Sequence, residues 1–289
     1  MKPIDYAAPR TLSEATGLLG QHGDRARVLA GGTDIIVQVR EGRKDIDLLV
    51  DVKRIPELNQ LQLDSHGLTI GAAVPCCLIY ENAAIARAYP GLIDAAALIG
   101  GIQIQSRATL GGNLCNASPA ADSIPPLIVH RAVCVIAGPH GTRELPVENF
   151  CTAPGKTALQ PNELLVCLKL PAPAARFGAG YLRFIPRNEM DIAVAGAAVS
   201  LELDDSKQRC TEAHVALAAV APTPLYVPAA GAALVDGAVN DALIDKVAAA
   251  AQEAARPISD MRGDADYRKH LVGVLTKRAL RMALERAQA

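Results

Sequence analysis

Two glycine-rich stretches decide the fold of this chain: Ala30-Gly31-Gly32-Thr33-Asp34 and Thr109-Leu110-Gly111-Gly112-Asn113. A Gly-Gly pair permits positive φ and leaves no Cβ in front of its amides, so successive N–H groups can converge on one anion. Either stretch alone fits an ordinary tight turn equally well. Together they predict two loops that grip one large polyanion such as a dinucleotide pyrophosphate. A branched side chain at Gly32 or Gly111 is expected to displace that anion and to leave much of the fold.

Composition indicates a globular protein and excludes several classes. Half of the 289 residues are hydrophobic, enough for one large domain or two to three smaller ones. The net charge of −1, with no basic stripe, argues against nucleic-acid binding. The first five residues carry no apolar signal-peptide core, and apolar runs are broken well before membrane-spanning length. A cytoplasmic protein without a membrane span is therefore expected.

Other cofactor and catalytic motifs find little support. The seven cysteines are scattered without the clustered spacing of a metal or iron–sulfur site, which favours free buried thiols. The tract Pro154-Gly155-Lys156-Thr157 ends like a P-loop, but Phe150 stands where its first glycine is required. No G-x-G-x-x-G follows a strand, and no histidine pairs with a serine or cysteine in a nucleophile motif.

Local patterns predict an α+β protein. Thr11 is a plausible N-cap, with Glu14 at the capping-box position. Helices are expected from residue 11 to about 20–23 and over 33–39, 75–88, 90–99, 125–130, 241–255 and 265–287. Strands are expected over 26–29, 47–52, 61–74, 132–137, 143–147, 164–170, 178–186, 193–204 and 211–220. The final helix carries basic residues on turns expected to be exposed: Arg268, Lys269, Lys277, Arg278 and Arg281.

Four tracts carry a family resemblance. Residues 109–122, which read TLGGNLCNASPAAD, resemble the flavin-binding signature of the molybdenum hydroxylases. That family includes xanthine dehydrogenases, carbon monoxide dehydrogenases and related aldehyde and N-heterocycle hydroxylases. Residues 29–36 resemble its other FAD loop, and residues 187–193 resemble the start of its C-terminal domain. Residues 257–268 resemble its closing helical region, so the likeness spans the chain in the expected order.

The resemblance implies a fold and a function. It implies a two-lobed FAD-binding domain, with lobes at residues 1–55 and 56–172. A C-terminal domain of three antiparallel strands with helices follows at 178–289. The chain would be the FAD-binding medium subunit, passing electrons from two [2Fe-2S] clusters of a small subunit through FAD to NAD or another acceptor. A large subunit would hold the molybdopterin-type molybdenum cofactor, in a dimer of heterotrimers. A stand-alone flavin oxidase or reductase, or a scaffold with a vestigial site, remains an alternative.

The resemblance also implies the cofactor contacts. Pyrophosphate and ribityl contacts fall on both glycine stretches, Asp122 on the adenosine side, and Ile99 with Gly100 and Gly101 beside the flavin ring. Asp122 could equally be a helix N-terminal residue, Arg183 a surface ion pair rather than a ring contact, and Asp191 a brace for the loop from Arg187. The implied contacts are Leu29, Ala30, Gly31, Gly32, Thr33, Asp34, Ile35, Ile36, Ile99, Gly100, Gly101, Thr109, Gly111, Gly112, Asn113, Asp122, Leu165 and Arg183.

Overall fold

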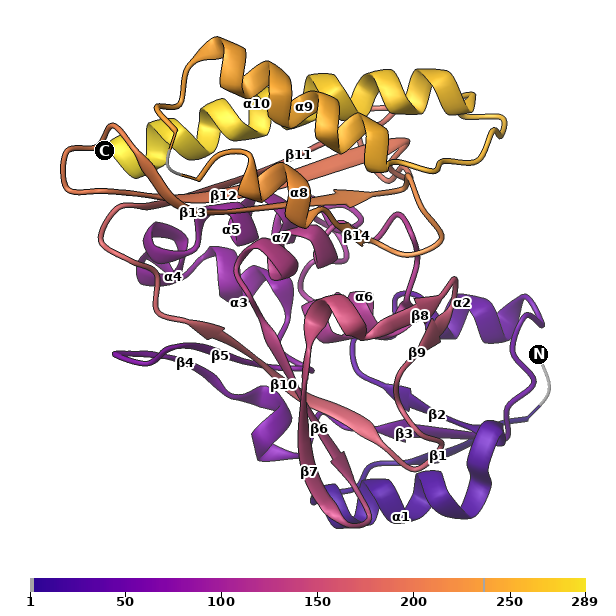
Figure 1. Ribbon diagram of the computed structural model, residues 1–289. Helices are drawn as coiled ribbons and strands as arrows, with labels where there is room; N and C mark the ends of the chain where they lie inside the picture. Colours follow the sequence, from indigo (N-terminus) through magenta and orange to yellow (C-terminus); the bar gives the residue numbers. More distant parts are fainter. Residues whose placement is uncertain (1–2, 236) are drawn as a thin grey trace.

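The computed structural model describes residues 3–235 and 237–289, and it has the predicted α+β character. Three main sheets organise the chain (Figure 1). A three-stranded and a five-stranded sheet lie in the lower half of Figure 1, and a four-stranded sheet lies above them. Among the described residues, no helix combines the length and the apolar character that crossing a bilayer requires.

The first sheet is parallel, with strand order β1-β3-β2. Helix α1 connects β1 to β2 and packs against β2 and β3. Its N-cap Thr11 accepts a bond from the Glu14 amide as predicted. The Glu14 carboxylate accepts from the Arg10 amide, so it braces the same turn from outside. The elements are β1 (Asp5–Ala7), α1 (Leu12–His22), β2 (Ala26–Leu29), α2 (Ile35–Arg40) and β3 (Leu48–Asp51).

The second sheet is antiparallel, with strand order β4-β5-β10-β6-β7. The single strand predicted over 61–74 is a hairpin, because the chain reverses at Gly67, where φ is 131°. The strands are β4 (Leu61–Asp64), β5 (Gly67–Gly71), β6 (Val133–Gly138), β7 (Gly141–Pro146) and β10 (Leu164–Pro171). A separate hairpin pairs β8 (Cys151–Ala153) with β9 (Lys156–Thr157).

Short helices connect the strands of this second lobe. The helix predicted over 75–88 is two helices, because the first ends with Glu81 as its C-cap and Asn82 caps the next through its side chain. The helices are α3 (Cys76–Tyr80), α4 (Ala83–Ala88), α5 (Pro90–Ala96), α6 (Leu110–Asn116) and α7 (Ile124–Val129). Of these, α5 and α7 pack against the upper sheet, joining the two halves of the molecule (Figure 1).

The C-terminal sheet contains the three predicted antiparallel strands and a fourth, two-residue strand at its edge. Its strands are β11 (Phe177–Phe184), β12 (Ala195–Leu203), β13 (Cys210–Ala218) and β14 (Leu225–Tyr226). Its outer face is covered by α8 (Pro228–Ala232) and α10 (Ala265–Gln288), with α9 (Asp241–Ala254) alongside (Figure 1). The sheet is therefore covered by helices on both faces, and its inner strands are buried.

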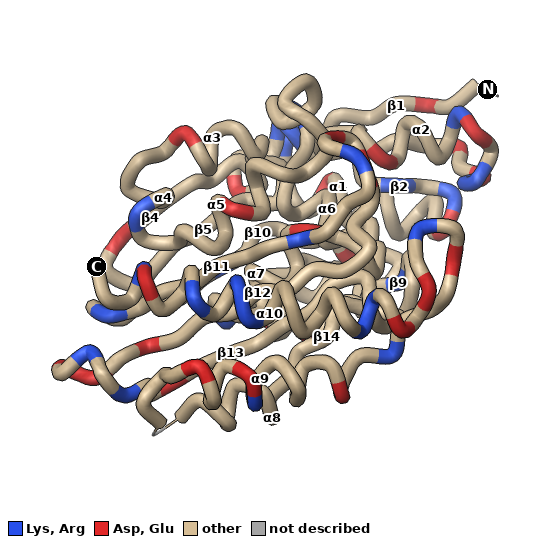
Figure 2. The backbone as a smooth tube through the Cα atoms, turned by 90° about the horizontal axis from the view of Figure 1, so that it is seen from above, with Lys and Arg blue, Asp and Glu red and all other residues tan. Residues whose placement is uncertain are grey.

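The basic residues of α10 do not form one exposed row. Arg268 is only 3% exposed, because its guanidinium donates to the carbonyl of Val194 and the carboxylate of Asp260. Lys277 and Arg281 pair with acidic residues of α9. Figure 2 accordingly shows acidic and basic residues interspersed along these helices. The prediction that Arg268 is exposed is wrong, and this residue instead ties α10 to the backbone beside the ends of β12 and β13.

Candidate functional site

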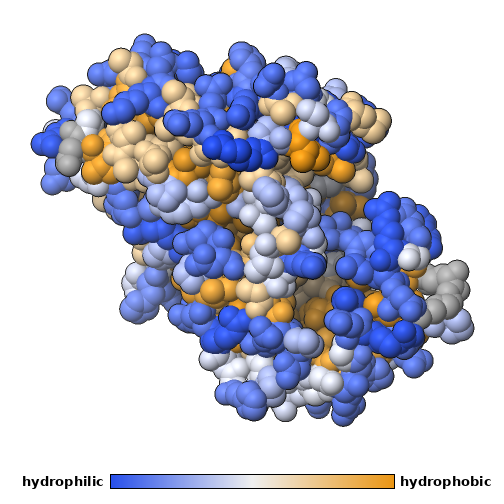
Figure 3. All heavy atoms as spheres, turned by 45° about the vertical axis from the view of Figure 1, so that its right-hand side comes forward, coloured by the Kyte–Doolittle hydropathy of each residue, from blue (hydrophilic) through white to orange (hydrophobic). Residues whose placement is uncertain are grey.

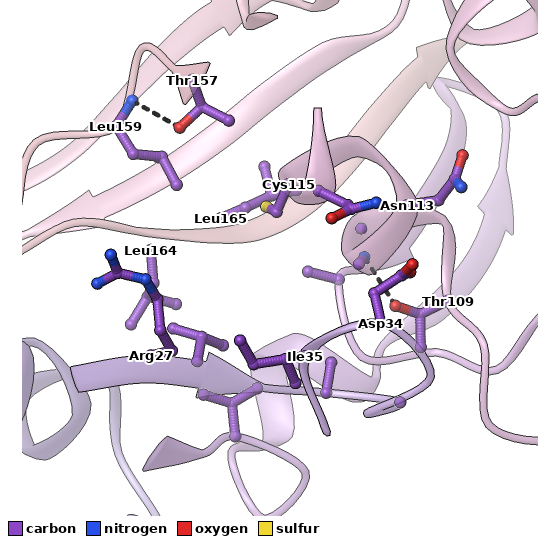
Figure 4. A pocket seen from close by; sticks show the side chains of 18 of the residues that line it. Arg27, Asp34, Ile35, Thr109, Asn113, Cys115, Thr157, Leu159, Leu164 and Leu165 are labelled. Carbon is purple, nitrogen blue, oxygen red and sulfur yellow. Dashed lines mark hydrogen bonds between the residues drawn. The ribbon is translucent and has the colours of Figure 1, made fainter. Parts of the chain in front are cut away.

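A cavity of about 550 Å³ lies between the first two sheets. Its walls come from β2, the loop into α2, α6, the β8–β9 hairpin and the start of β10. Figure 3 shows the surface hollowed near its middle, with hydrophobic residues exposed between hydrophilic ones. Figure 4 shows Asp34 and Thr109 at one side of this space, and Arg27 near Leu164 at the other. Pockets of this size and mixed polarity suit an organic ligand.

The first glycine stretch forms a loop that a side chain would disrupt. A Cβ on Gly31 would lie 1.9 Å from the carbonyl oxygen of Arg107, so this glycine allows its loop to touch the segment that precedes α6. Gly32 has a φ of 82°, the left-handed conformation predicted for this pair. Lys53 donates to the carbonyl oxygen of Ala30 at 3.0 Å and pairs with Asp51 at 2.8 Å. Lys53 thus connects the loop to Asp51 at the end of β3.

The second glycine stretch is the first turn of α6 and not a left-handed loop. The Thr109 side chain caps it, accepting from the Gly112 amide at 2.8 Å. The Asn113 amide donates to the Thr109 carbonyl at 3.0 Å, so the cap and the first helical bond already use the Gly112 and Asn113 amides. A Cβ on Gly111 would lie 2.5 Å from the Ala72 carbonyl oxygen, whereas one on Gly112 would meet only the Thr109 hydroxyl.

The two glycines of α6 therefore differ in purpose. Gly111 permits close packing between α6 and the end of β5, and Gly112 keeps the cavity wall free of a side chain. The expectation that a branched side chain at Gly111 would displace the anion and leave much of the fold is wrong, because that side chain would meet the Ala72 backbone. For Gly32 the space is filled by the side chains of Leu29 and Ile36.

Two side-chain bonds fix the polar wall. Gln38 of α2 donates to Asn116 of α6 at 2.9 Å and so joins the two lobes beside the cavity. Asn113 accepts from both the amide and the hydroxyl of Ser123. Because a backbone amide can only donate, the Asn113 oxygen faces Ser123, and its NH₂ group is turned away from that residue. The amide orientation of Asn113 is thus determined.

A third wall was missed by the sequence analysis. Thr152, Gly155, Lys156 and Thr157 line the cavity from the β8–β9 hairpin, where Gly155 has a φ of 69°. The hairpin is held against α6 by the Gly155 amide, which donates to the Ala117 carbonyl at 2.9 Å. The P-loop interpretation was correctly set aside, because Pro154 and Gly155 form the turn of an antiparallel hairpin and Lys156 and Thr157 are its second strand. The Gly-Lys-Thr composition was nevertheless the available signal for a ligand-facing turn.

Charged residues of both signs line the cavity. Cations are contributed by Arg27, Lys44 and Lys156. Asp34 is largely exposed at the rim, yet the protein atoms around its carboxyl raise its pKa. Further along the cavity, hydrogen bonds from Arg143 lower the pKa of Glu163, which stays ionised. The cavity thus offers cationic side chains to an anion, and an apolar interior.

Twelve of the predicted contact residues line this cavity. They are Ala30, Gly31, Gly32, Thr33, Asp34, Ile35, Ile99, Thr109, Gly111, Gly112, Asn113 and Leu165. Both glycine stretches, 80 residues apart in the sequence, are therefore brought to one space. Within the described part of the chain, the other six predicted residues are outside the lining: Leu29, Ile36, Gly100, Gly101, Asp122 and Arg183.

Asp122 and Arg183 lie beside the site and bond to each other. Arg183 donates to one carboxylate oxygen of Asp122 at 2.5 Å, and Tyr181 donates to the other at 2.7 Å. Both ionic side chains are about nine-tenths buried. Arg183 therefore forms an ion pair, one of the two alternatives considered for it, but the pair is internal and not on the surface. Gly100 and Gly101 pack toward Ile104 and Met190. Contacts of these residues with a cofactor remain predictions.

Comparison with known proteins identifies the family. Residues 2–173 match the model for the FAD binding domain in molybdopterin dehydrogenase. Residues 180–283 match the model for the CO dehydrogenase flavoprotein C-terminal domain. The chain belongs to this family of flavoproteins. It is the FAD-binding medium subunit of a molybdenum hydroxylase and thus part of an oxidoreductase.

Relatives of this flavoprotein cover its whole length. It is 31% identical to the xanthine dehydrogenase FAD-binding subunit of Escherichia coli O157:H7, over 98% of this chain and 96% of that one. It is 33% identical to the carbon monoxide dehydrogenase medium chain of Hydrogenophaga pseudoflava, over 98% of each. A solved carbon monoxide dehydrogenase of H. pseudoflava matches with a TM-score of 0.94 and 34% identity, covering 99% of this chain and 98% of that one. Quinoline 2-oxidoreductase of Pseudomonas putida 86 matches with a TM-score of 0.91 and 27% identity, covering all of both chains.

Proposed function

We propose that this flavoprotein is the electron-exit subunit of its complex. In this proposal, bound FAD supplies a redox centre that takes electrons from [2Fe-2S] clusters of a small subunit and delivers them to an external acceptor. The observation that carries the proposal is that residues of both glycine stretches line the same cavity. The chain's own task is to hold the cofactor in place between the clusters and the surface.

The residues of the cavity fit FAD. The missing Cβ of Gly112 leaves a space that any other residue would fill, next to the first amides of α6. The Asn113 NH₂ group is free of Ser123 and can donate to a phosphate or ribityl oxygen. Arg27, Lys44 and Lys156 add positive charge. Apolar side chains such as Leu164 and Leu165 offer an apolar surface to a flat ring.

The proposed division of labour follows the chain. Residues 1–55 and 56–172 form the two lobes that hold FAD, and residues 178–289 form the C-terminal domain. The twelve lining residues predicted from the sequence are proposed as direct contacts, together with the β8–β9 hairpin. The proposed backbone donors lie in the loop at Gly31–Thr33.

The partners are proposed from the names of the relatives. A relative is called a medium chain of carbon monoxide dehydrogenase, and one solved structure is described as lacking the Mo-pyranopterin part of its molybdenum cofactor. We infer a large molybdenum-binding subunit and a small iron–sulfur subunit, assembled as a dimer of heterotrimers in the cytoplasm. NAD or another carrier would receive the electrons.

Depleting the native complex of FAD tests this role. Substrate should still bleach the iron–sulfur absorbance in rapid mixing, because those centres lie on other chains. Reduction of the external acceptor should fail and should return when FAD is restored. If depleted complex cannot bleach its clusters until FAD is restored, the flavin lies at the substrate end and a flavin enzyme with its own substrate is favoured.

A further inference from the structure

A buried cluster joins the C-terminal sheet to the segment that follows α6. Strand β11 contributes Tyr181 and Arg183, which donate to separate oxygens of Asp122. Tyr181 is 1% exposed and Asp122 is 7% exposed, so water competes little with these bonds. Burial and the neighbouring Asp122 charge raise the pKa of Tyr181 well above its usual value, which keeps its hydroxyl a donor. The cluster is therefore a fixed attachment point.

The same segment is anchored twice more. The amide of Ala219, at the end of β13, donates to the Pro119 carbonyl at 2.7 Å. Ser123, which is fully buried, donates its amide and hydroxyl to the Asn113 side chain. A continuous path of short contacts thus runs from β11 through Asp122 and Ser123 to Asn113 on the cavity wall.

We propose that Asp122 is a positioning residue, held by Tyr181 and Arg183 so that Ser123 orients the Asn113 amide toward the cofactor. This inference rests on the proposed function. It makes the C-terminal domain a determinant of FAD affinity, although β11 contributes no residue to the cavity lining. Each Asp122 oxygen already accepts a bond from β11, and its side chain is about one-tenth exposed.

Binding of FAD to the purified full chain, freed of flavin, tests the idea. Tyr181→Phe removes one bond to Asp122 without touching the cavity and should raise the Kd for FAD by about tenfold. Tyr89→Phe is the matched control, because Tyr89 is equally buried and donates to the Pro171 carbonyl, outside the cavity lining. The control should lose similar stability in thermal unfolding and keep the Kd.

A double-mutant cycle separates positioning from general loosening. Ser123→Ala removes the hydroxyl bond to Asn113, the shorter of its two bonds to that side chain, so Tyr181→Phe should add less than about twofold to the Kd once Ser123→Ala is present. Multiplied effects of the two changes, or an unaltered Kd in Tyr181→Phe, would overturn the inference while leaving FAD binding intact. A parent chain that does not quench FAD fluorescence would instead overturn the proposed function, and this inference with it.

Discussion

Arg286 and Asp94 lie 192 residues apart in the sequence and form a two-pronged ion pair. The Arg286 guanidinium, near the end of α10, donates to both carboxylate oxygens of Asp94 on α5, at 2.6 and 2.9 Å. It also donates to the Ala179 carbonyl on β11, and Asp94 accepts from the Tyr181 amide on the same strand. One contact therefore locks the last helix, the first C-terminal strand and the second lobe together.

Removing this contact should loosen the C-terminal domain. Arg286→Ala is expected to lower the free energy of unfolding by about 1.5–3 kcal/mol, because charge-assisted bonds are lost and Asp94 keeps fewer partners. The matched control is Arg281→Ala, whose pair with Asp241 is half exposed or more on both sides and should cost less than about 1 kcal/mol. Urea titration of both variants measures the two losses in the free energy of unfolding. Equal losses would show that the Arg286 pair contributes no more stability than the exposed Arg281 pair.

The glycines of α6 should separate folding from cofactor retention. Gly111→Ala places a Cβ against the Ala72 backbone and should destabilise the fold by about 1–3 kcal/mol. Gly112→Val should instead fold, with FAD lost from the purified protein, because its side chain enters the cavity wall. Thermal unfolding and bound-flavin absorbance are measured together, with Gly17→Ala as a control whose Cβ meets open space. A flavin-loaded Gly112→Val chain would refute the assignment.

Acid sensitivity should depend on His130. Its Nδ1–H donates to the Pro126 carbonyl at 2.7 Å, and its ring packs against Tyr89 and Phe177. Burial lowers its pKa to about 4, against smaller opposing effects of the hydrogen bond to Pro126 and of the Asp94 charge. As the pH falls, this histidine is therefore protonated in the unfolded chain before it is protonated in the folded chain. The stability that depends on neutral His130 is fully present above about pH 6.5 and is lost as the pH falls toward 4.

His130→Gln should remove this contribution. Between pH 7 and pH 5 the parent should lose roughly 2 kcal/mol more than the variant, because only the parent has this histidine to protonate on unfolding. His66→Gln, at an exposed position, serves as the control and should follow the parent. Urea titrations at the two pH values measure the difference. Identical pH dependence in His130→Gln and the parent would contradict the assignment.

The FAD should be bound without a covalent link. Cys115 is the thiol in the cavity wall, and its surroundings raise its pKa to about 12, so little reactive thiolate is present at neutral pH. Acid precipitation should therefore release the yellow cofactor into the supernatant. Flavin that stays with the pellet would show a tether, and Cys115→Ser would then test whether this thiol forms it.

Local signals in the sequence predicted much of the fold. Strand β2 and the Thr11 cap were predicted correctly, because both depend on neighbouring residues in the chain. The ligand role of the β8–β9 hairpin could not be read in this way, since its position depends on a bond between Gly155 and Ala117. The internal pairing of Arg183 with Asp122 likewise follows from packing between distant segments. Family resemblance located the two glycine stretches but not the purpose of each glycine.

The position of β10 in its sheet has a consequence for how the protein is made. This strand is central in the order β4-β5-β10-β6-β7, yet it is the last of the five to leave the ribosome. Its first residues, Leu164 and Leu165, also wall the cavity. The nascent chain therefore cannot complete the cavity until more than half of its length has been synthesised. Cofactor loading is confined to a late stage of translation or to the finished polypeptide.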